Sequence, residues 1–440
     1  MVVDTIEELE ATLEYIKDRK TLIIPVLSDH QLHVSQNKIT CIYVYTEDDV
    51  ERIIPITHTE QIKGFSEHLQ RFLELPGIFI YDKKQWLHLN GNADVYDIKT
   101  LWWYTYNEAY DETHYYTAAH QFYWRRHQNM QHVNAIIPIM NHLAMCQKIR
   151  HYAWPMCMNA KLTDSYLRFN SIYPYVYSSI ERNGLRVNNT FKSPELINND
   201  LVFTNYNYYT STGRPSNTFR GFNFAAMNKE DGTRDAFCSR FERGALVEMD
   251  FDSYHVRLIA KLIGYELPTQ SIHDYFGQFY FGTDELTQEQ REESKQITFR
   301  LLYGGIDKEF LVIPFFQKVH DFVYTLWAKS KQRGYIETPI LKRQIYTENI
   351  TNITANKLFN YFLQAIETEV STQKLKQIVE YMSDKKSVMI LYTYDSVLCD
   401  VEYEEAATVL PEIKRILEQG NFTVKSKCGN IYSKIRNITL

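Results

Sequence analysis

The pattern of hydrophobic and polar positions separates helix-like from strand-like segments in the first third of the chain. Residues 5–20 and 60–75 carry apolar side chains three and four positions apart, which is the spacing of an amphipathic helix. Residues from about 97 to 170 are mostly helical by the same criterion. Strand-like runs rich in β-branched residues lie at 21–27, 38–47, 52–58 and 77–82. This order predicts an α/β domain of roughly 150 residues with a helical tail.

From residue 171 onward, the pattern of hydrophobic and polar positions changes. Residues 171–188 predict a helix that enters a turn at Gly184 and continues as a strand. Residues 188–217 are rich in Asn and Tyr and have no clear period, so they predict loops or short strands. Residues 271–335 are rich in helical patterns. We find no internal repeat and no low-complexity linker.

Two acidic residues stand at the ends of predicted strands. "GALVEMDFD" (244–252) predicts a strand that reaches Asp250, and "SVMILYTYDSVLCDVE" (387–402) predicts an antiparallel hairpin with Asp395 at its tip. Carboxylates brought together by neighbouring strands can bind two Mg²⁺ ions about 3.5–4 Å apart, which clamp the attacking and leaving oxygens of phosphoryl transfer. Either acid alone is more commonly a turn or cap residue.

A stripe of cations and rings runs along "REESKQITFRLLYGG" (291–305). Arg291, Lys295, Phe299 and Tyr303 recur every four residues and therefore follow one side of a helix. Two cations one turn apart can bind a triphosphate, and a ring two turns further on can lie against a nucleobase. An ordinary amphipathic helix with solvated cations and buried rings explains the stripe equally well when it is considered alone.

Composition and charge exclude little. The chain is 44% hydrophobic and 23% charged, as in an ordinary soluble protein, and its net charge is −6. Residues 1–150 hold 14 Lys and Arg against 20 Asp and Glu, whereas residues 151–440 hold 34 of each. The neutral part can therefore still carry a locally basic cleft.

Cysteine spacing and the N-terminus point to the cell interior. The six cysteines form no CxxC pair and no zinc-type spacing, which predicts free thiols in a reducing compartment. The N-terminus is acidic where a signal peptide would be basic, and the longest apolar runs are far too short to span a bilayer. We expect a soluble, cytoplasmic protein without a membrane partner.

The segments occur in the order acid, cationic helix, acid, and in that order the sequence resembles the family-A DNA polymerases of the bacterial polymerase I type. "DFDSYHVRLIAKL" (250–262) is similar to the first acidic motif, residues 291–305 to the helix of the fingers, and "YTYDSVLCDV" (392–401) to the third motif. Shorter matches extend the resemblance over about residues 173–440. They are "IERNGLRVN", "TGRPSN" with Arg214, "FNFAA" with Asn223, "TRDAF" with Arg234, "SIHDYFGQFYFG" with His273, and "NYFLQAIETE" with Asn360 and Gln364.

The resemblance implies a role for each matched residue. Asp250, Asp395 and the carbonyl of Phe251 would be the catalytic metal ligands, with two Mg²⁺ per active site and Mn²⁺ as a substitute. The implied dNTP contacts are Arg291, Lys295 and His273 on the phosphates, with Phe299, Tyr303 and His255 shaping the nucleotide pocket. The implied primer–template contacts are Arg214, Asn223, Arg234, Asn360 and Gln364.

Three positions near the acids depart from the family pattern. Position 255 is His where the family's DNA enzymes carry a Glu that blocks a ribose 2′-OH, so we expect weakened sugar discrimination. Positions 394 and 396 are Tyr and Ser rather than His and Glu, which removes a carboxylate beside the metals. Asp252 is a candidate to replace part of that charge; otherwise we expect it to cap the following helix.

Two larger parts of the family pattern are also changed. Only residues 188–211 separate the palm entry from Thr-Gly-Arg, too few for a helical thumb, so we expect the thumb to be absent or vestigial. Weak, salt-sensitive DNA binding would follow. The N-terminal part resembles the 3′–5′ exonuclease domain in strand order, with Asp82 and Asp97 near expected positions. It lacks the other carboxylates, which predicts a degenerate, structural domain.

The predicted fold class is therefore α+β, with a right-hand polymerase palm of antiparallel strands and helical fingers, preceded by an α/β exonuclease-like domain of the RNase H type. The expected boundaries are 1–150 for the exonuclease-like domain, 151–172 for a helical connector, 173–264 and 346–440 for the palm, 265–345 for the fingers, and 188–211 for the vestigial thumb.

The resemblance implies a DNA-dependent DNA polymerase that adds dNTPs to a primer 3′-OH by two-metal phosphoryl transfer, without proofreading and with low processivity. Its partners would be primer–template DNA, dNTPs and a processivity or replication protein. The reduced architecture suits a phage protein in the host cytoplasm. Two alternatives stay open. One is a single-subunit RNA polymerase, which shares the Asp-Ser of the third motif but not Thr-Gly-Arg or Phe299. The other is an inactive scaffold that binds primer ends.

Overall fold

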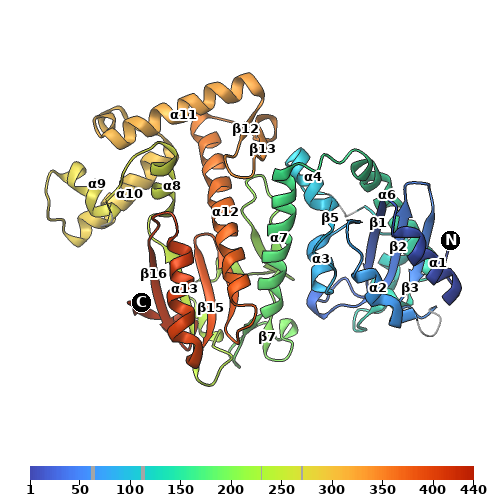
Figure 1. Ribbon diagram of the computed structural model, residues 1–440. Helices are drawn as coiled ribbons and strands as arrows, with labels where there is room; N and C mark the ends of the chain where they lie inside the picture. Colours follow the sequence, from blue (N-terminus) through green and yellow to red (C-terminus); the bar gives the residue numbers. More distant parts are fainter. Residues whose placement is uncertain (61–64, 111–113, 229, 269–270) are drawn as a thin grey trace.

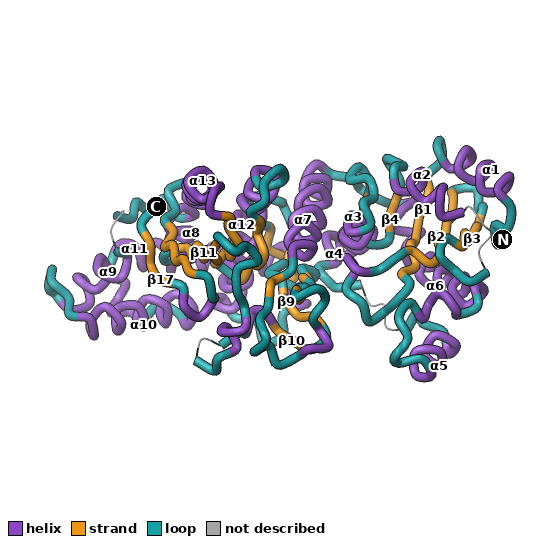
Figure 2. The backbone as a smooth tube through the Cα atoms, turned by 90° about the horizontal axis from the view of Figure 1, so that it is seen from below, coloured by secondary structure: helices purple, strands orange, loops and turns teal. Residues whose placement is uncertain are grey.

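Two folded units lie side by side. The computed structural model describes residues 1–60, 65–110, 114–228, 230–268 and 271–440. Figure 1 shows an N-terminal unit, residues 1–158, beside a larger C-terminal unit, residues 164–440. Seen from below, the molecule is elongated, with the chain start at one end and helices of residues 272–333 at the other (Figure 2).

A five-stranded mixed sheet forms the centre of the N-terminal unit. Its strands are β1 (Thr21–Leu27), β2 (Ile39–Thr46), β3 (Glu51–Pro55), β4 (Phe79–Ile80) and β5 (Tyr96–Asp97), in the order β3-β2-β1-β4-β5. The helices of this unit are α1 (Ile6–Ile16), α2 (Leu69–Leu73), α3 (Lys83–His88), α4 (Ile98–Tyr106), α5 (Ala118–Arg126) and α6 (Ile139–Met158). Leu22 and Ile24 pack in the core that contains α6, whereas Ile23 packs in the core that contains α1. Because both faces are covered, β1 reads as a continuous hydrophobic run.

An antiparallel sheet forms the centre of the C-terminal unit. Its strands are β11 (Gly244–Phe251), β14 (Val388–Thr393), β15 (Ser396–Glu402), β16 (Val424–Gly429) and β17 (Arg436–Ile438), in the order β14-β15-β11-β16-β17. The helices packed with it are α7 (Asp164–Asn183), α8 (Tyr254–Leu262), α12 (Ala355–Tyr381) and α13 (Ala406–Glu418). Alternation along β11 directs Val247, Met249 and Phe251 into the largest core, together with residues of α8 and α12. Asp250 therefore points to the other side of the sheet from these side chains.

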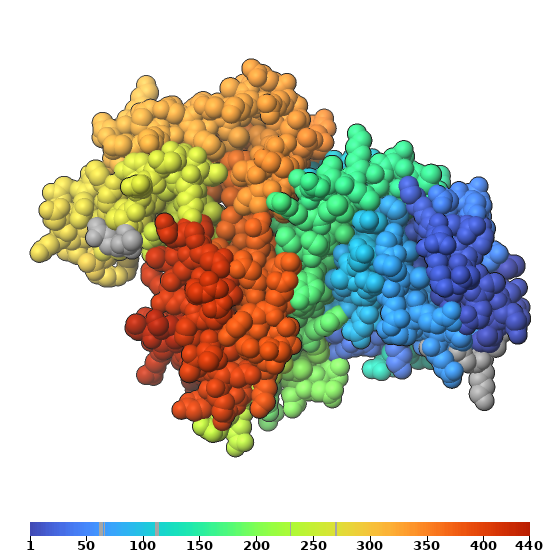
Figure 3. Space-filling model, in the orientation of Figure 1, coloured from blue at the N-terminus to red at the C-terminus, as the bar shows by residue number. Residues whose placement is uncertain are grey.

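Helices α9 (Ile272–Phe281), α10 (Gln288–Gly304) and α11 (Pro314–Arg333) form a lobe that projects from the sheet (Figures 1 and 3). The hairpin β12 (Tyr335–Glu337) and β13 (Gln344–Tyr346) returns the chain to α12. Helix α10 begins at a capping box in which Thr287 and Gln290 each accept the other's backbone N–H, at 3.2 and 2.9 Å. It ends at Gly305, where φ is +113° and an added Cβ would lie 2.5 Å from the Asn356 amide. Glycine is therefore required at this end.

The segment between α7 and β11 consists of turns and short strands. The strands are β6 (Leu185–Arg186), β7 (Leu201–Val202), β8 (Tyr206–Asn207), β9 (Ser216–Phe219) and β10 (Phe222–Asn223). Within residues 184–211, all of which the structure describes, there is no α-helix.

The fold class predicted from the sequence is confirmed, with helices and strands mixed in both units and an antiparallel sheet in the second. The predicted hairpin is formed by β14 and β15. Part of the helix expected over 60–75 lies outside the described residues; the rest forms a 3-10 turn at Phe65–His68 and then α2. None of the described helices has the length and apolar character needed to cross a bilayer.

Candidate active site

The two acids predicted to converge lie on adjacent backbone segments. Asp250 is the last residue but one of β11, and Asp395 lies in the turn that joins β14 to β15. Because β11 and β15 are antiparallel neighbours, Asp250 lies opposite Ser396, and the Phe251 N–H donates to the Asp395 carbonyl at 3.1 Å. Sheet register therefore brings together two acidic residues that are far apart in the chain.

The turn that carries Asp395 has an unusual backbone. Tyr394 has a φ of +58°, a left-handed conformation that costs roughly 1–2 kcal/mol for a residue with a Cβ. The Arg214 guanidinium lies 4.1 Å from the centre of the Tyr394 ring, a favourable cation–π contact that supports the turn. Burial and the charge of Glu367 raise the pKa of the Asp395 carboxyl. These two effects outweigh the opposing charges of Arg214 and His255.

Helix α10 presents part of its stripe to the same place. Lys295, Phe299 and Tyr303 line the cavity above the two acids, and the Phe299 and Tyr303 rings stack with centroids 5.9 Å apart. Ser294 donates to the His273 carbonyl at 2.6 Å, which ties α10 to α9. Asn360 of α12 donates to the Tyr303 carbonyl at 3.2 Å and so holds the C-terminal end of α10.

A cavity of about 550 Å³ lies between the sheet, α10 and α12. Its lining combines carboxylates, cations, histidines and rings, as is usual for a site that binds a charged, partly aromatic ligand. The lining residues are Arg214, Asp250, Phe251, Asp252, Ser253, Tyr254, His255, His273, Lys295, Phe299, Tyr303, Asn360, Gln364, Glu367, Asp395 and Lys425.

A hydrogen-bonded chain of side chains crosses the cavity wall. The Nδ1 of His255 contacts the Tyr303 hydroxyl, and its Nε2 lies 2.9 Å from the Glu367 carboxylate. Glu367 also accepts from Arg214 at 3.3 Å. Since a carboxylate only accepts, His255 donates through Nε2. Burial, followed by the charge of Glu367, raises the pKa of Tyr303 to about 12, so its hydroxyl stays protonated at neutral pH.

Three buried polar atoms at the cavity have no hydrogen-bond partner among the described residues. They are Arg214 Nε, His273 Nδ1 and Asn360 Oδ1. Buried polar groups are normally paired, and these three atoms could hydrogen-bond to a ligand in the cavity. Burial also lowers the pKa of His273, which keeps its imidazole neutral at pH 7.

Three of the residues proposed from the sequence do not line the cavity. Arg291 is half-exposed on α10, and its Nε donates to Asp274 at 2.8 Å. Asn223 is exposed and its side chain accepts from the Ala225 N–H within its own turn. Arg234 lies over the Tyr432 ring and 3.8 Å from the Glu248 carboxylate.

Two charged residues of the cavity were not identified from the sequence. Glu367 lies on the same side of α12 as Asn360 and Gln364, at positions i, i+4 and i+7, so helical spacing alone offered a signal for it. Lys425 on β16 pairs in register with Asp250, which follows only from the observed strand order.

The expectation that Asp252 caps the following helix is wrong. The N-terminal cap of α8 is Ser253, which has a φ of +52° and makes no side-chain capping bond. The Asp252 carboxylate instead forms an ion pair with Lys425 at 2.5 Å. Asp252 lines the cavity together with its partner.

The two acids singled out in the N-terminal unit are engaged in structural bonds. Asp82 caps α3, where it accepts the Gln85 N–H at 2.9 Å, and pairs with Lys99 at 3.0 Å. Asp97 accepts from the Thr100 hydroxyl at 2.5 Å and from the Tyr209 hydroxyl at 3.3 Å. Burial and the neighbouring charge of Asp82 raise the pKa of Asp97 to about 6.

Known proteins resemble this chain in part of its sequence and in its fold. No protein-family model matches the chain. A curated relative is DNA polymerase I of Bacillus subtilis, 21% identical over 252 residues; the match covers 49% of this chain and 29% of that protein, so the chain spans less than a third of its length. Among solved structures, the polymerase domain of Pol1 from M. smegmatis, in complex with DNA primer-template and dNTP, superimposes with a TM-score of 0.74 at 15% identity, over 99% of this chain and 100% of that chain.

Proposed function

We propose that this chain, which has the polymerase-domain fold of the family-A DNA polymerases, is a template-directed DNA polymerase. It would add dNTPs to a primer 3′-OH by phosphoryl transfer. The observation that carries the proposal is the convergence of Asp250, Asp395 and Lys295 on one cavity. Carboxylates below and a cation above suit the metal ions and the triphosphate of this reaction.

The donor set fits divalent metal binding. The described residues contain no cluster of three or more His, Cys, Asp or Glu side chains that could enclose an ion. Mg²⁺ needs no such cluster, because it is commonly bound by one or two carboxylates together with substrate phosphates and water. Asp250, Asp395 and the Phe251 carbonyl would hold the ions. When bound, two Mg²⁺ ions supply charge neutralisation at the attacking and leaving oxygens.

The chain's own residues would bind and orient the substrates around those ions. Lys295 and His273 suit the triphosphate, with Arg291 at the outer end of α10. Phe299, Tyr303 and His255 would enclose the base and sugar. For the primer–template we propose Arg214, Asn360 and Gln364 within the cavity, and Asn223 and Arg234 outside it.

The described residues 188–211 form no α-helix, which supports the proposal that a thumb is missing. Without a thumb to hold the duplex behind the active site, DNA binding would be weak, salt-sensitive and distributive. A processivity or replication protein would then compensate. This reduced architecture suits a phage-encoded enzyme acting in the host cytoplasm.

We also propose that the N-terminal unit lacks 3′–5′ exonuclease activity. Asp82 and Asp97 are already occupied by Lys99 and Thr100, so they are poorly placed to hold metals. A 5′-labelled primer incubated with Mg²⁺ and without dNTP should keep its length in gel analysis, and Asp82→Asn should behave identically. Shortening by the native chain that Asp82→Asn abolishes would contradict this expectation.

Sugar discrimination should depend on Glu367. Because Glu367 orients His255 against Tyr303, Glu367→Ala should lower the dNTP-to-rNTP ratio of kcat/KM by about tenfold, or about 1.4 kcal/mol. Glu367→Gln keeps an acceptor for Nε2 and should retain most of the preference. The ratio cancels any common loss of activity. Equal use of rNTP and dNTP by the native chain would refute a role for His255 and Tyr303 in sugar discrimination.

The test of the proposed function is extension of a labelled primer by the purified chain. The native chain should extend an annealed primer with dNTPs and Mg²⁺, and Asp250→Ala should not. RNA synthesis from a promoter without a primer would favour the single-subunit RNA polymerase instead. Primer binding without any extension would favour the inactive scaffold.

A further inference from the structure

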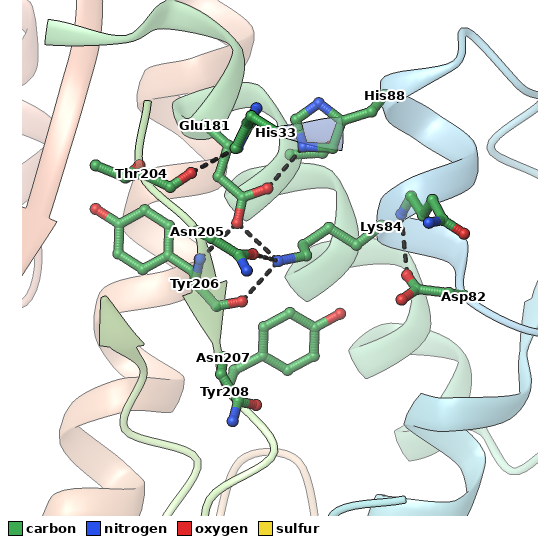
Figure 4. Close-up of polar contacts among 12 residues, drawn as sticks. His33, Asp82, Lys84, His88, Glu181, Thr204, Asn205, Tyr206, Asn207 and Tyr208 are labelled. Carbon is green, nitrogen blue, oxygen red and sulfur yellow. Dashed lines mark hydrogen bonds and ion pairs between the residues drawn. The ribbon is translucent and has the colours of Figure 1, made fainter. Parts of the chain in front are cut away.

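The N-terminal unit forms hydrogen bonds to a segment that leads into the proposed active site. This segment, residues 204–214, is called the support segment below; it contains β8 and ends at Arg214. Lys84 of α3 reaches across to it and donates to the Asn205 side chain at 2.8 Å and to the Tyr206 carbonyl at 2.6 Å (Figure 4). A lysine of one unit thus satisfies polar groups of the other.

A fully buried carboxylate completes this contact. Glu181 of α7 lies 2.7 Å from Lys84 Nζ, 2.6 Å from His88 Nε2, and accepts the Tyr206 N–H at 2.6 Å (Figure 4). Burial alone would raise the pKa of Glu181, but Lys84 and His88 lower it to about 2. An ionised group kept inside the protein needs all of these partners, so the arrangement fixes the position of Tyr206.

Further along, α4 holds the rest of the support segment. Trp103 Nε1 donates to the Thr210 carbonyl at 2.9 Å, and the Tyr209 hydroxyl reaches Asp97 at 3.3 Å. Gly213 packs on Trp103 so closely that a Cβ there would lie 3.3 Å from the indole. Contacts from the N-terminal unit therefore continue to the residue before Arg214.

Arg214 depends on this support for its own placement. Its carbonyl accepts from the Thr210 hydroxyl at 2.9 Å, so the end of the segment is tied back to the residue that Trp103 holds. From there the guanidinium reaches Tyr394 and Glu367 at the cavity. A continuous set of bonds joins α3 and α4 to a cavity residue.

We propose that the N-terminal unit is a positioning element for polymerisation: through Lys84 and Trp103 it holds the support segment, and so holds Arg214 where a primer end is bound. This inference rests on the proposed function for its catalytic consequence. Its structural half, the ordering of residues 204–214 by the N-terminal unit, does not depend on the activity.

The test compares two neighbouring lysines of α3. Lys84→Met removes the contacts to the support segment and the ion pair with Glu181. Lys83→Met removes a buried lysine that donates within the N-terminal unit, to the Val95 carbonyl at 3.1 Å. Lys84→Met should raise the Kd of a fluorescent primer–template about tenfold. It should also speed amide hydrogen exchange in residues 205–214, with the KM for dNTP unchanged. Lys83→Met should lower the melting temperature without either effect.

Two further variants keep the outcome decisive. Trp103→Phe keeps an aromatic ring at this position but loses the indole N–H that donates to Thr210, so it should weaken primer–template binding even if Lys84→Met folds poorly. In an Arg214→Ala background, Lys84→Met should add less than about a twofold change, because the two residues act through one contact. Full additivity, or equal binding by the Lys83→Met and Lys84→Met chains, would overturn the proposal, as would unchanged exchange in 205–214. If the native chain shows no primer extension, the proposed function fails. Hydrogen exchange would still show whether the N-terminal unit orders the support segment.

Discussion

Replacing Asp395 by Asn should lower the kcat of primer extension by about a thousandfold, since a bound metal supplies several kcal/mol of transition-state stabilisation and each 1.36 kcal/mol is tenfold. Asp250 lies on β11 and Asp395 in the β14–β15 turn beside it, and the other two carboxylates of the cavity, Asp252 and Glu367, are paired with basic side chains. Loss of the Asp395 carboxylate would remove one of the two side chains proposed to hold the metal ions. Single-turnover addition of one dNTP measures the effect.

The same substitution should leave the fold intact. Burial and the charge of Glu367 already raise the pKa of Asp395, so in the absence of metal an ionised carboxylate there is unfavourable. Asp395→Asn should therefore melt at the same temperature as the native chain, or higher, in EDTA. Asp252→Asn is the graded control, because Asp252 is paired with Lys425, and its loss should cost less than about tenfold in kcat. Full activity in Asp395→Asn would remove the metal site from the account.

Lys295→Met should raise the KM for dNTP by about 10- to 100-fold, the equivalent of one charge-assisted hydrogen bond of about 1.5–3 kcal/mol. Lys295 is the only lysine or arginine of the described α10 that lines the cavity. No other cation of α10, which the structure describes in full, reaches the cavity, so the phosphates would lose their cationic contact with this helix. Steady-state kinetics at saturating primer–template give the value.

Arg291→Met is the matched control on the same helix. Arg291 is half-exposed and paired with Asp274, so we expect its loss to change the KM for dNTP by less than about fivefold. Affinity for primer–template should be unchanged in both variants. If the two substitutions raised KM equally, α10 would have to rotate when nucleotide binds, and the arrangement seen here would not be the one that binds substrate.

Local periodicity in the sequence predicted two of the elements that form this site. The hairpin that presents Asp395 was predicted from two apolar runs around "TYDS", and α10 from its four-residue repeat. The geometry of the repeat also explains why Arg291, unlike Lys295, does not line the cavity. Each step of four residues turns about 40° around a helix with 3.6 residues per turn, so three steps carry Arg291 about 120° away from Tyr303. A stripe in the sequence is a spiral on the helix, and its far end leaves the cavity.

Several residues that tertiary contacts place in the cavity were named only through the family resemblance, and others were not predicted. Lys425 lies opposite Asp250 because β16 is the neighbour of β11. Strand order cannot be predicted from local periodicity. Asp252 was expected as a helix cap, but Ser253 occupies the cap position and the Asp252 carboxylate pairs with Lys425 instead. The support segment read as an irregular, polar stretch because its order comes from Lys84 and Trp103 in another unit.

We propose above all that carboxylates from β11 and the β14–β15 turn hold divalent metal beneath α10. Anomalous diffraction from Mn²⁺ in crystals of the chain with primer–template and a non-hydrolysable dNTP tests this directly. We expect anomalous peaks in contact with both Asp250 and Asp395, with the triphosphate against Lys295. Mn²⁺ bound elsewhere, or a triphosphate remote from α10, would contradict it.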